Sequence, residues 1–302
     1  MRRKAYRLLV RALSLFILPP WRGKAFRDCR LKADPFPGFA MTVAALPHLK
    51  DVVDTVVLGS SHAHYGYYAE GNVFNLGYTS CDLYHSYGLY KWLAGNGFDK
   101  VKNVIMFFDV FSPGFELEKT SDSFFHRPFE ESFGIAARCP LAKIGRKKER
   151  ILKARIRHSV CQARRNPDLG WRGNGDYAIV IKDSVERRVE GHLKNCFRGN
   201  GQTQYLGEMA KLASQRGDRF VVVVPPLRED YRKLLPPYDV VFGELQALTK
   251  ENPCIEVASL LDDARFHDDD FNDMDHLNLQ GAKKLARIVE SLMHEGASNG
   301  KL

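Results

Sequence analysis

Ser61 is the first residue of this chain whose type and position could support covalent chemistry. It follows the apolar run Thr55–Leu58 in the sequence Gly59-Ser60-Ser61-His62. A serine hydroxyl becomes a nucleophile when a base removes its proton, and the amide of that serine can then help to hold the resulting oxyanion. A serine in this place is also a common turn or N-cap residue, so its position alone does not decide between the two roles.

A base of the right type lies far downstream, in Asp273-Met274-Asp275-His276-Leu277-Asn278. Asn278 is expected to be the N-cap of a final helix, which leaves His276 on the loop before it. Asp273 can accept a hydrogen bond from the imidazole Nδ1–H, which fixes the tautomer and leaves Nε2 free to act as base. The pattern therefore predicts a triad of Ser61, His276 and Asp273. The competing interpretation is a helix cap beside a surface histidine.

Predicted strands and helices alternate along the chain, and their packing must bring these residues together. Strands are predicted at 55–58, 73–76, 104–108, 220–224 and 255–258. Helices are predicted at about 80–93, at about 206–216, and from 279 to a stop before Gly296, because apolar residues recur there at helical spacing. Such alternation predicts an α/β protein with a parallel sheet covered by helices on both faces. Ligands bind at the carboxyl ends of such strands, where Ser61 lies.

The stretch from about residue 113 to residue 201 breaks this alternation. It has no strong strand, is rich in arginine and phenylalanine, and carries apolar residues at helical spacing between Ile144 and Ala163. We interpret it as a basic helical insertion within one domain that spans residues 33–302. Its expected role is to cover the site or to bind an anionic surface, and a solvated charged helix is the simpler alternative.

The net charge of +9 is concentrated in two segments. Residues 1–32 and residues 143–165 each hold ten lysines and arginines against one acidic residue, so the rest of the chain carries −9. Residues 1–32 are interpreted as a basic amphipathic arm, because the apolar run Ala12–Leu18 is too short to cross a membrane and no signal-peptide cleavage site follows it. We expect a cytoplasmic protein that contacts the anionic inner membrane peripherally through both segments. The alternative is an arm packed on the acidic body.

Other classes of site have little support in the sequence. The six cysteines are scattered and form no C-x-x-C pair, so they indicate neither a zinc site nor a disulfide framework. The aspartates between Asp268 and Asp275 lack the central glycine and terminal glutamate of an EF-hand loop. Phosphate-binding and dinucleotide-binding glycine motifs are absent, and nucleic-acid binding would rest on charge alone. We therefore predict no cofactor, no metal ion and no nucleic-acid partner, and the oligomeric state stays open.

These motifs resemble those of the SGNH/GDSL hydrolase superfamily, over about residues 50–112 and 203–294. Its first block, Gly-x-Ser, matches Gly59-Ser60-Ser61, the glycine of its second block matches Gly77, and its last block, Asp-x-x-His, matches Asp273 to His276. The resemblance implies a flavodoxin-like three-layer sandwich with a five-stranded parallel sheet, Ser61 as nucleophile, and the amides of Ser61 and Gly77 as oxyanion donors. The segments L-G-S-S-H-A and D-x-D-H-L-N-x-x-G-A are especially similar to bacterial members linked to modification of surface polysaccharides and cell-wall polymers.

One block departs from the family pattern. Where the third block offers an asparagine whose side-chain amide completes the oxyanion hole, this chain has Asp109, in Phe108-Asp109-Val110-Phe111-Ser112. A carboxylate would repel an oxyanion, so either two amides suffice or another donor such as Ser112 takes the place. The loss of one donor typically costs about 3–4 kcal/mol.

The sequence and the resemblance together predict serine-dependent hydrolysis or transfer of acyl, in particular acetyl, esters. The expected substrate is an acylated carbohydrate of a bacterial polysaccharide or glycan. The alternative is a non-catalytic, membrane-associated scaffold of polysaccharide assembly that keeps the fold.

Overall fold

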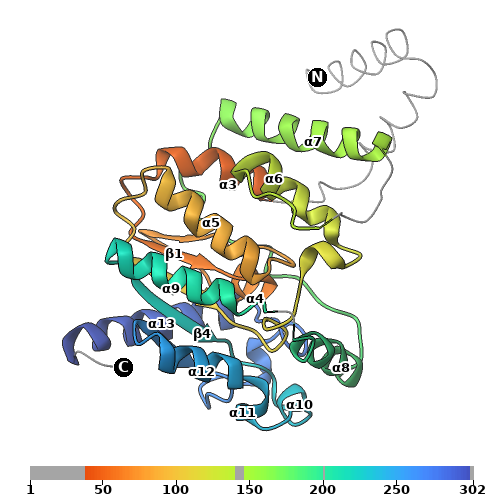
Figure 1. Ribbon diagram of the computed structural model, residues 1–302, viewed down its shortest axis with the longest axis vertical. Helices are drawn as coiled ribbons and strands as arrows, with labels where there is room; N and C mark the ends of the chain where they lie inside the picture. The colour runs from red at the N-terminus through yellow and green to blue at the C-terminus, as the bar shows by residue number, and fades with distance from the viewer. Residues whose placement is uncertain (1–37, 140–145, 200, 300–302) are drawn as a thin grey trace. The chain divides into compact units, whose positions relative to one another are not determined.

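A five-stranded sheet lies at the centre of the computed structural model, which describes residues 38–139, 146–199 and 201–299. Its strands are β1 Thr55–Leu58, β2 Val73–Asn75, β3 Asn103–Phe107, β4 Arg219–Val224 and β5 Ile255–Ser259. Every neighbouring pair is parallel and the order is β2-β1-β3-β4-β5, the order of the flavodoxin-like folds (Figure 1). The predicted fold class is confirmed. The predicted N-terminal arm, residues 1–32, and residues 143–145 lie outside the described residues.

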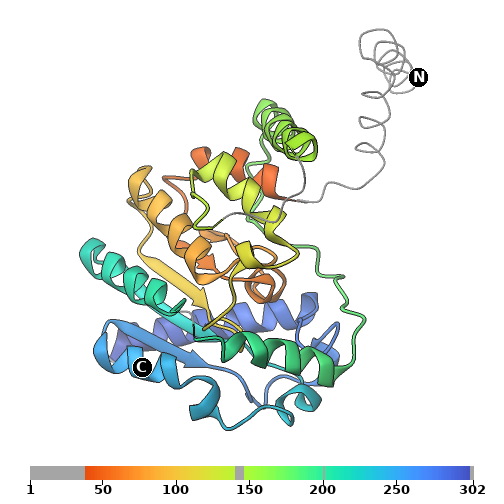
Figure 2. The same ribbon diagram turned by 45° about the vertical axis from the view of Figure 1, so that its right-hand side comes forward.

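Helices cover both faces of this sheet. Figures 1 and 2 show α5 and α9 on one side and α13 on the other. The longer core helices are α5 Leu83–Gly95, α9 Gln204–Arg216, α12 Gly243–Glu251 and α13 Leu279–Asn299. The shorter ones are α3 Phe39–Ala45, α4 Ser61–Gly66, α10 Glu229–Arg232 and α11 Tyr238–Val241, together with the 3-10 helices η1 Leu46–His48 and η4 Asp268–Asp270.

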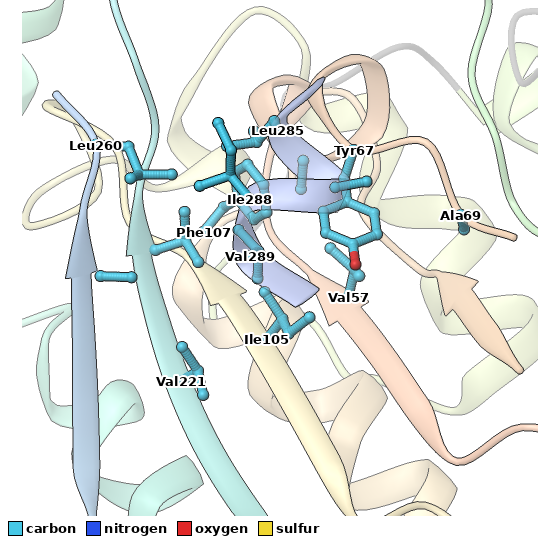
Figure 3. Packing of buried hydrophobic residues seen from close by; sticks show 14 of the residues in the cluster. Val57, Tyr67, Ala69, Ile105, Phe107, Val221, Leu260, Leu285, Ile288 and Val289 are labelled. Carbon is cyan, nitrogen blue, oxygen red and sulfur yellow. The ribbon is translucent and has the colours of Figure 1, made fainter. Parts of the chain in front are cut away.

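The alternation of side chains along each strand builds the core. Val57, Ile105 and Val221 share one face of the sheet and pack against Leu285 and Val289 of α13 (Figure 3). All five side chains are almost fully buried. Because burying an aliphatic side chain of this size stabilises a fold by about 1.5–3 kcal/mol, this layer fixes α13, and with it the loop before α13, against the sheet.

The carboxyl ends of β1 and β3 lie side by side, because β1 pairs with both β2 and β3. After β1 the chain continues to β2 on one side, and after β3 it continues to β4 on the other side. Ligands bind in the crevice that forms where the strand order reverses in this way. Gly59, directly after β1, permits the close approach of the two strand ends: it has a φ of +139°, and a Cβ on it would lie 2.8 Å from the Cβ of Phe107. Ser61 follows at this crevice.

The predicted insertion contains helices and loops and, in its described residues, no strand. Its helices are η2 Leu117–Lys119, η3 Ser123–Phe125, α6 His126–Phe133, α7 Arg146–Arg165 and α8 Val185–Cys196. The loop between α7 and α8 returns to the sheet, where the Asn75 amide of the edge strand β2 donates to the Arg172 carbonyl (2.8 Å). The insertion therefore contributes both to the edge of the sheet and, through α8, to the crevice.

Two helix boundaries differ from the prediction. The final helix continues through Gly296 to Asn299, because a glycine inside a helix costs only about 1 kcal/mol and does not end the helix by itself. The helix predicted from about residue 80 begins at Leu83, because Asp82 is the N-cap of α5 and accepts from the His85 amide (2.9 Å). Among the described residues, no helix combines the length and the apolar character needed to cross a membrane.

Candidate active site

The three predicted triad residues meet at the carboxyl edge of the sheet. His276 Nε2 lies 3.0 Å from the Ser61 hydroxyl oxygen, and His276 Nδ1 lies 3.0 Å from Asp273 Oδ2. His276 and Asp273 are buried and Ser61 is half-buried. This is the hydrogen-bond chain in which a carboxylate orients an imidazole and the imidazole can take the proton of a serine.

Local structure holds each member of this chain in place. Ser61 is the first residue of α4, and Ser60 caps that helix by accepting from the His62 amide (3.2 Å). His276 precedes α13, whose first amides donate to the Asn278 side chain at 2.9 and 3.0 Å, as predicted for a cap. Because both residues sit next to capped helix starts, neither depends on a mobile loop for its position.

Backbone amides hold the Asp273 carboxylate in its ionised form. It accepts from the amides of Asp275 (3.0 Å), His276 (2.8 Å) and, from the insertion, Ile181 (2.8 Å). Burial alone would raise the pKa of Asp273, but the hydrogen bond from His276 and the charge of that imidazole lower it below its ordinary value. A carboxylate that stays ionised can stabilise the imidazolium that forms when Ser61 is deprotonated.

Ser61 opens into a pocket of about 380 Å³. The sheet side supplies Ser60, Ser61, Thr79, Ser80, Phe111 and His276, whereas the insertion supplies the opposite wall. That wall consists of Phe115, Asp122, Ile179, Ile181, Asp183, Arg187, Arg188, Gly191, His192 and Asn195. The insertion thus covers the candidate site, one of the two roles expected for it, with a surface that mixes apolar and charged side chains.

Gly77, the second predicted oxyanion donor, is not placed for that role. Its amide donates to the Asn75 side-chain oxygen (2.9 Å), and Gly77 is not among the residues that line the Ser61 pocket. The glycine is needed for packing instead, because a Cβ there would lie 2.6 Å from the Cβ of Ala63. The prediction for Gly77 is therefore corrected.

Ser80, unlike Gly77, lies at the Ser61 pocket. It is the only non-glycine residue with a positive φ (60°) in the described part of the chain. This left-handed conformation costs a non-glycine residue about 1–2 kcal/mol, and such strain gathers at functional sites. Within the described residues its N–H has no hydrogen-bond acceptor, and the same holds for the Ser61 amide in the first turn of α4. Ser61 and Ser80 thus each place a backbone amide that has no acceptor in the described part of the chain among the residues that line this pocket.

Asp109 takes part in a buried network that sequence reasoning missed. Its carboxylate accepts from the Ser60 hydroxyl (2.5 Å) and contacts His62 Nδ1 (2.7 Å). The other ring nitrogen of His62 lies 3.0 Å from Asp275, which also accepts from Arg188 Nη2 (2.7 Å). Asp109 is thus directed at an imidazole and a hydroxyl, and its charge is compensated there.

Ser112, the alternative donor considered from the sequence, does not lie at the Ser61 pocket either. Its hydroxyl oxygen accepts from the Asp109 amide (2.8 Å). The role of Ser112 is to cap the turn that orients Asp109. Neither residue of this segment therefore supplies the side-chain donor of the third block.

The charge state of His62 follows from its two carboxylate partners. Burial alone lowers the pKa of His62, but the charges and hydrogen bonds of Asp109 and Asp275 outweigh burial and raise the pKa to about 10. Burial alone would raise the pKa of Asp275, but the hydrogen bond from His62 and the charges of His276, His62 and Arg188 hold it well below its ordinary range. The site therefore contains a buried imidazolium between two carboxylates.

The contacts of His62, Asp275 and His276 do not fit a metal site. One nitrogen atom of His62, one oxygen atom of Asp275 and one nitrogen atom of His276 lie within 4.8 Å of one another. A metal ligand needs a free lone pair. Both ring nitrogens of His62 instead donate to carboxylates, and His276 is engaged with Asp273 and Ser61. The residues present favour proton transfer over ion binding.

The raised pKa of His62 predicts a pH-dependent stability. The unfolded chain loses this proton near pH 6.5, whereas the folded protein keeps it up to about pH 10. The stabilisation is therefore complete below pH 6.5 and is lost as the pH rises toward 10, with a slope that approaches about 1.4 kcal/mol per pH unit. Urea unfolding as a function of pH should give a shallower alkaline slope for His62→Gln than for the wild type. Equal slopes would contradict the assignment of the charge.

Comparison with known proteins adds no family to this geometry. No protein-family model matches the chain, and no curated protein matches it either.

Proposed function

We propose that this protein is a serine-dependent ester hydrolase or acyltransferase of the SGNH/GDSL type, with Ser61 as nucleophile. The observation that carries the proposal is the position of His276, which lies 3.0 Å from both the Ser61 hydroxyl and the Asp273 carboxylate. The resemblance of the sequence motifs and the flavodoxin-like strand order support the same conclusion.

The proposed reaction begins with attack of the Ser61 Oγ on an ester carbonyl carbon while His276 Nε2 takes the hydroxyl proton. The amides of Ser61 and Ser80 donate to the carbonyl oxygen as it becomes an oxyanion. The tetrahedral intermediate collapses when the bond to the leaving alcohol breaks and His276 returns the proton to that alcohol. Water or a sugar hydroxyl, deprotonated by His276, then attacks the acyl-serine and releases the acid or the new ester.

The proposed substrate is an acylated, in particular acetylated, carbohydrate. This part of the proposal rests on the resemblance to polysaccharide-modifying members of the superfamily. The pocket is compatible with it, because Phe111 and Ile181 offer apolar surface next to the polar Asn195 and Asp183. The acyl-enzyme is common to hydrolysis and transfer, so both remain within the proposal.

Release of acetate from acetylated oligosaccharides tests the proposed function. We expect turnover by the wild type and loss of turnover in Ser61→Ala. Ser259→Ala, at an exposed position at the end of β5, serves as the matched control and should keep wild-type turnover. Full activity of Ser61→Ala would refute the nucleophile assignment.

A second candidate function is a non-catalytic scaffold of polysaccharide assembly. The observation that favours it is Asp109, which stands where the family offers an amide donor and is bound to Ser60 and His62. A scaffold should bind the glycan without turning over any ester. Binding of acetylated oligosaccharide by the wild type, with no acetate release and no acyl-enzyme, would favour the scaffold over the enzyme.

We further propose that α7 contributes to peripheral contact with an anionic membrane surface. Its apolar residues Ile156 and Val160 are buried, and α7 packs on α3, so this side is not free to enter a bilayer. Arg157, Arg164 and Arg165 are exposed. The proposed contact is therefore electrostatic, and it should weaken as ionic strength increases.

A further inference from the structure

A second cluster of buried polar side chains lies where the insertion packs on the core. His85 comes from α5 of the core, whereas Glu118 of η2 and His126 of α6 come from the insertion. The helices α5 and α6 are neighbours in Figure 1 and contact one another. His85 and His126 are 0% exposed and Glu118 is 2% exposed, and none of the three lines the Ser61 pocket. The proposed reaction uses none of them.

Nitrogen and oxygen atoms of these three side chains converge on one point. His85 Nε2 lies 2.8 Å from His126 Nδ1, which lies 3.5 Å from Glu118 Oε1. One candidate ligand atom of each residue lies within 4.8 Å of those of the other two. Ligands at 2.0–2.1 Å from a tetrahedral zinc ion are separated by about 3.3 Å. The two observed separations bracket that value, so ion binding would need small side-chain rotations and a shift of the His126 proton from Nδ1, which contacts His85 Nε2, to Nε2, which has no partner in the described part of the chain.

Outer contacts orient the side chains as they do around known metal ions. His85 Nδ1 lies 2.6 Å from Asp82 Oδ1, which fixes the tautomer and directs the Nε2 lone pair at the convergence point. Arg138 donates its amide to Glu118 Oε1 (2.9 Å) and its Nε to Oε2 (3.3 Å). The Leu117 amide and the Arg138 guanidinium hold the second oxygen of Asp82 at 2.9 and 3.4 Å. His85 has one ring nitrogen facing a carboxylate, whereas both ring nitrogens of His62 face carboxylates.

The charges of the cluster also favour a cation. The carboxylates of Asp82 and Glu118 face one guanidinium, that of Arg138, so with both imidazoles neutral the buried cluster carries a net charge of −1. His126 Nε2 has no hydrogen-bond partner among the described residues. The two buried carboxylates would attract a divalent cation, which would engage three ligand atoms at once and change the net charge to +1.

We propose that His85, Glu118 and His126 bind one divalent transition-metal ion at the junction of the insertion and the core. Two imidazoles and a carboxylate suit Zn²⁺, whereas hard cations such as Mg²⁺ and Ca²⁺ prefer oxygen atoms alone. The ion would link α5 to η2 and α6, and so fix the insertion that forms one wall of the Ser61 pocket. The proposal is independent of the proposed function.

Metal analysis of the full chain tests the proposal. Protein purified without chelators, and freed of any polyhistidine tag, should contain about one zinc ion per chain by mass spectrometry. Removal of the ion with 1,10-phenanthroline should lower the Tm, and added Zn²⁺ should restore it. Co²⁺ added to the metal-free protein should give the visible absorption bands of a tetrahedral site.

Variants then assign the ligands. His85→Gln and His126→Gln should abolish the cobalt bands, whereas Asp82→Asn should weaken zinc affinity by about 10–100-fold, as loss of an outer partner does. His64→Gln replaces another buried histidine, outside the cluster, and should leave the metal content unchanged. Circular dichroism checks that each variant is folded.

The wild type alone can overturn the proposal if the variants fail to fold. Wild-type protein from zinc-supplemented medium that contains no stoichiometric metal, and whose Tm and absorption do not respond to Zn²⁺ or Co²⁺, would contradict it. The cluster would then be a hydrogen-bonded pair of buried histidines.

Discussion

Replacing His276 by alanine is expected to lower kcat for ester cleavage by about 10⁴- to 10⁶-fold. His276 Nε2 is the base within reach of the Ser61 hydroxyl, at 3.0 Å. Without it, the serine must lose its proton to water at neutral pH, and the leaving alcohol must depart without a proton donor. Single-turnover measurements on an activated acetate ester isolate the chemical step and can detect a loss of rate this large.

The non-additivity of the triad provides the control for this prediction. Because Ser61 and His276 act as one unit, the double variant Ser61→Ala/His276→Ala should lose no more activity than either single variant. Asp273→Asn should lower kcat by about 10⁴-fold, since an amide no longer selects the productive tautomer. His158→Ala, at an exposed position of α7, should leave kcat unchanged. A loss of less than about tenfold in His276→Ala would contradict its role as base.

Replacing Asp275 by alanine is expected to destabilise the fold by about 3–5 kcal/mol, the largest stability effect of a single substitution in this site. Its carboxylate contacts His62 Nε2 (3.0 Å) and accepts from Arg188 Nε and Nη2 (2.9 and 2.7 Å). Removing it leaves a buried imidazolium with one carboxylate partner and a guanidinium with none of these bonds. The free energy of urea unfolding at neutral pH measures the loss.

Asp269→Ala is the matched control for that measurement. Asp269 belongs to the same acidic loop but its side chain is exposed, so its replacement should change stability by no more than about 0.5 kcal/mol. His62→Gln in the Asp275→Ala background should recover part of the stability, because it removes the uncompensated charge. Equal stabilities of Asp275→Ala and Asp269→Ala would show that the network contributes nothing to the fold.

Much of the fold could be predicted from local patterns. The run Thr55–Leu58 is a strand with the predicted bounds, and the run at 220–224 is a strand extended by one residue, because buried parallel strands require continuous apolar sequence. The helix α4 was not predicted, since six residues are too few to show a helical period. The predicted end of α13, before Gly296, is wrong because a single glycine does not end a helix that is stabilised by packing against the sheet.

Residues of the candidate site could be predicted only where a local sequence motif marks their position. Ser61 follows a strand and His276 precedes a capped helix, so both could be found from their neighbours in sequence. The role of Ser80 depends on a positive φ at a residue that rarely adopts one, and its sequence carries no signal of this. The contact of His62 with Asp275 joins residues 213 positions apart, and no periodicity links them. Both His62 and Asp275 lie inside the two recognised motifs, which is the signal that could have directed attention to them.

Labelling with a fluorophosphonate probe tests the central claim most directly. The probe reacts with a serine whose hydroxyl is activated by a neighbouring base, and intact-mass measurement counts the adducts independently of the substrate. We predict one adduct per folded chain, mapped by peptide sequencing to Ser61 and absent from Ser61→Ala. Folded wild-type protein that takes up no probe, or that carries it on another residue, would contradict the account.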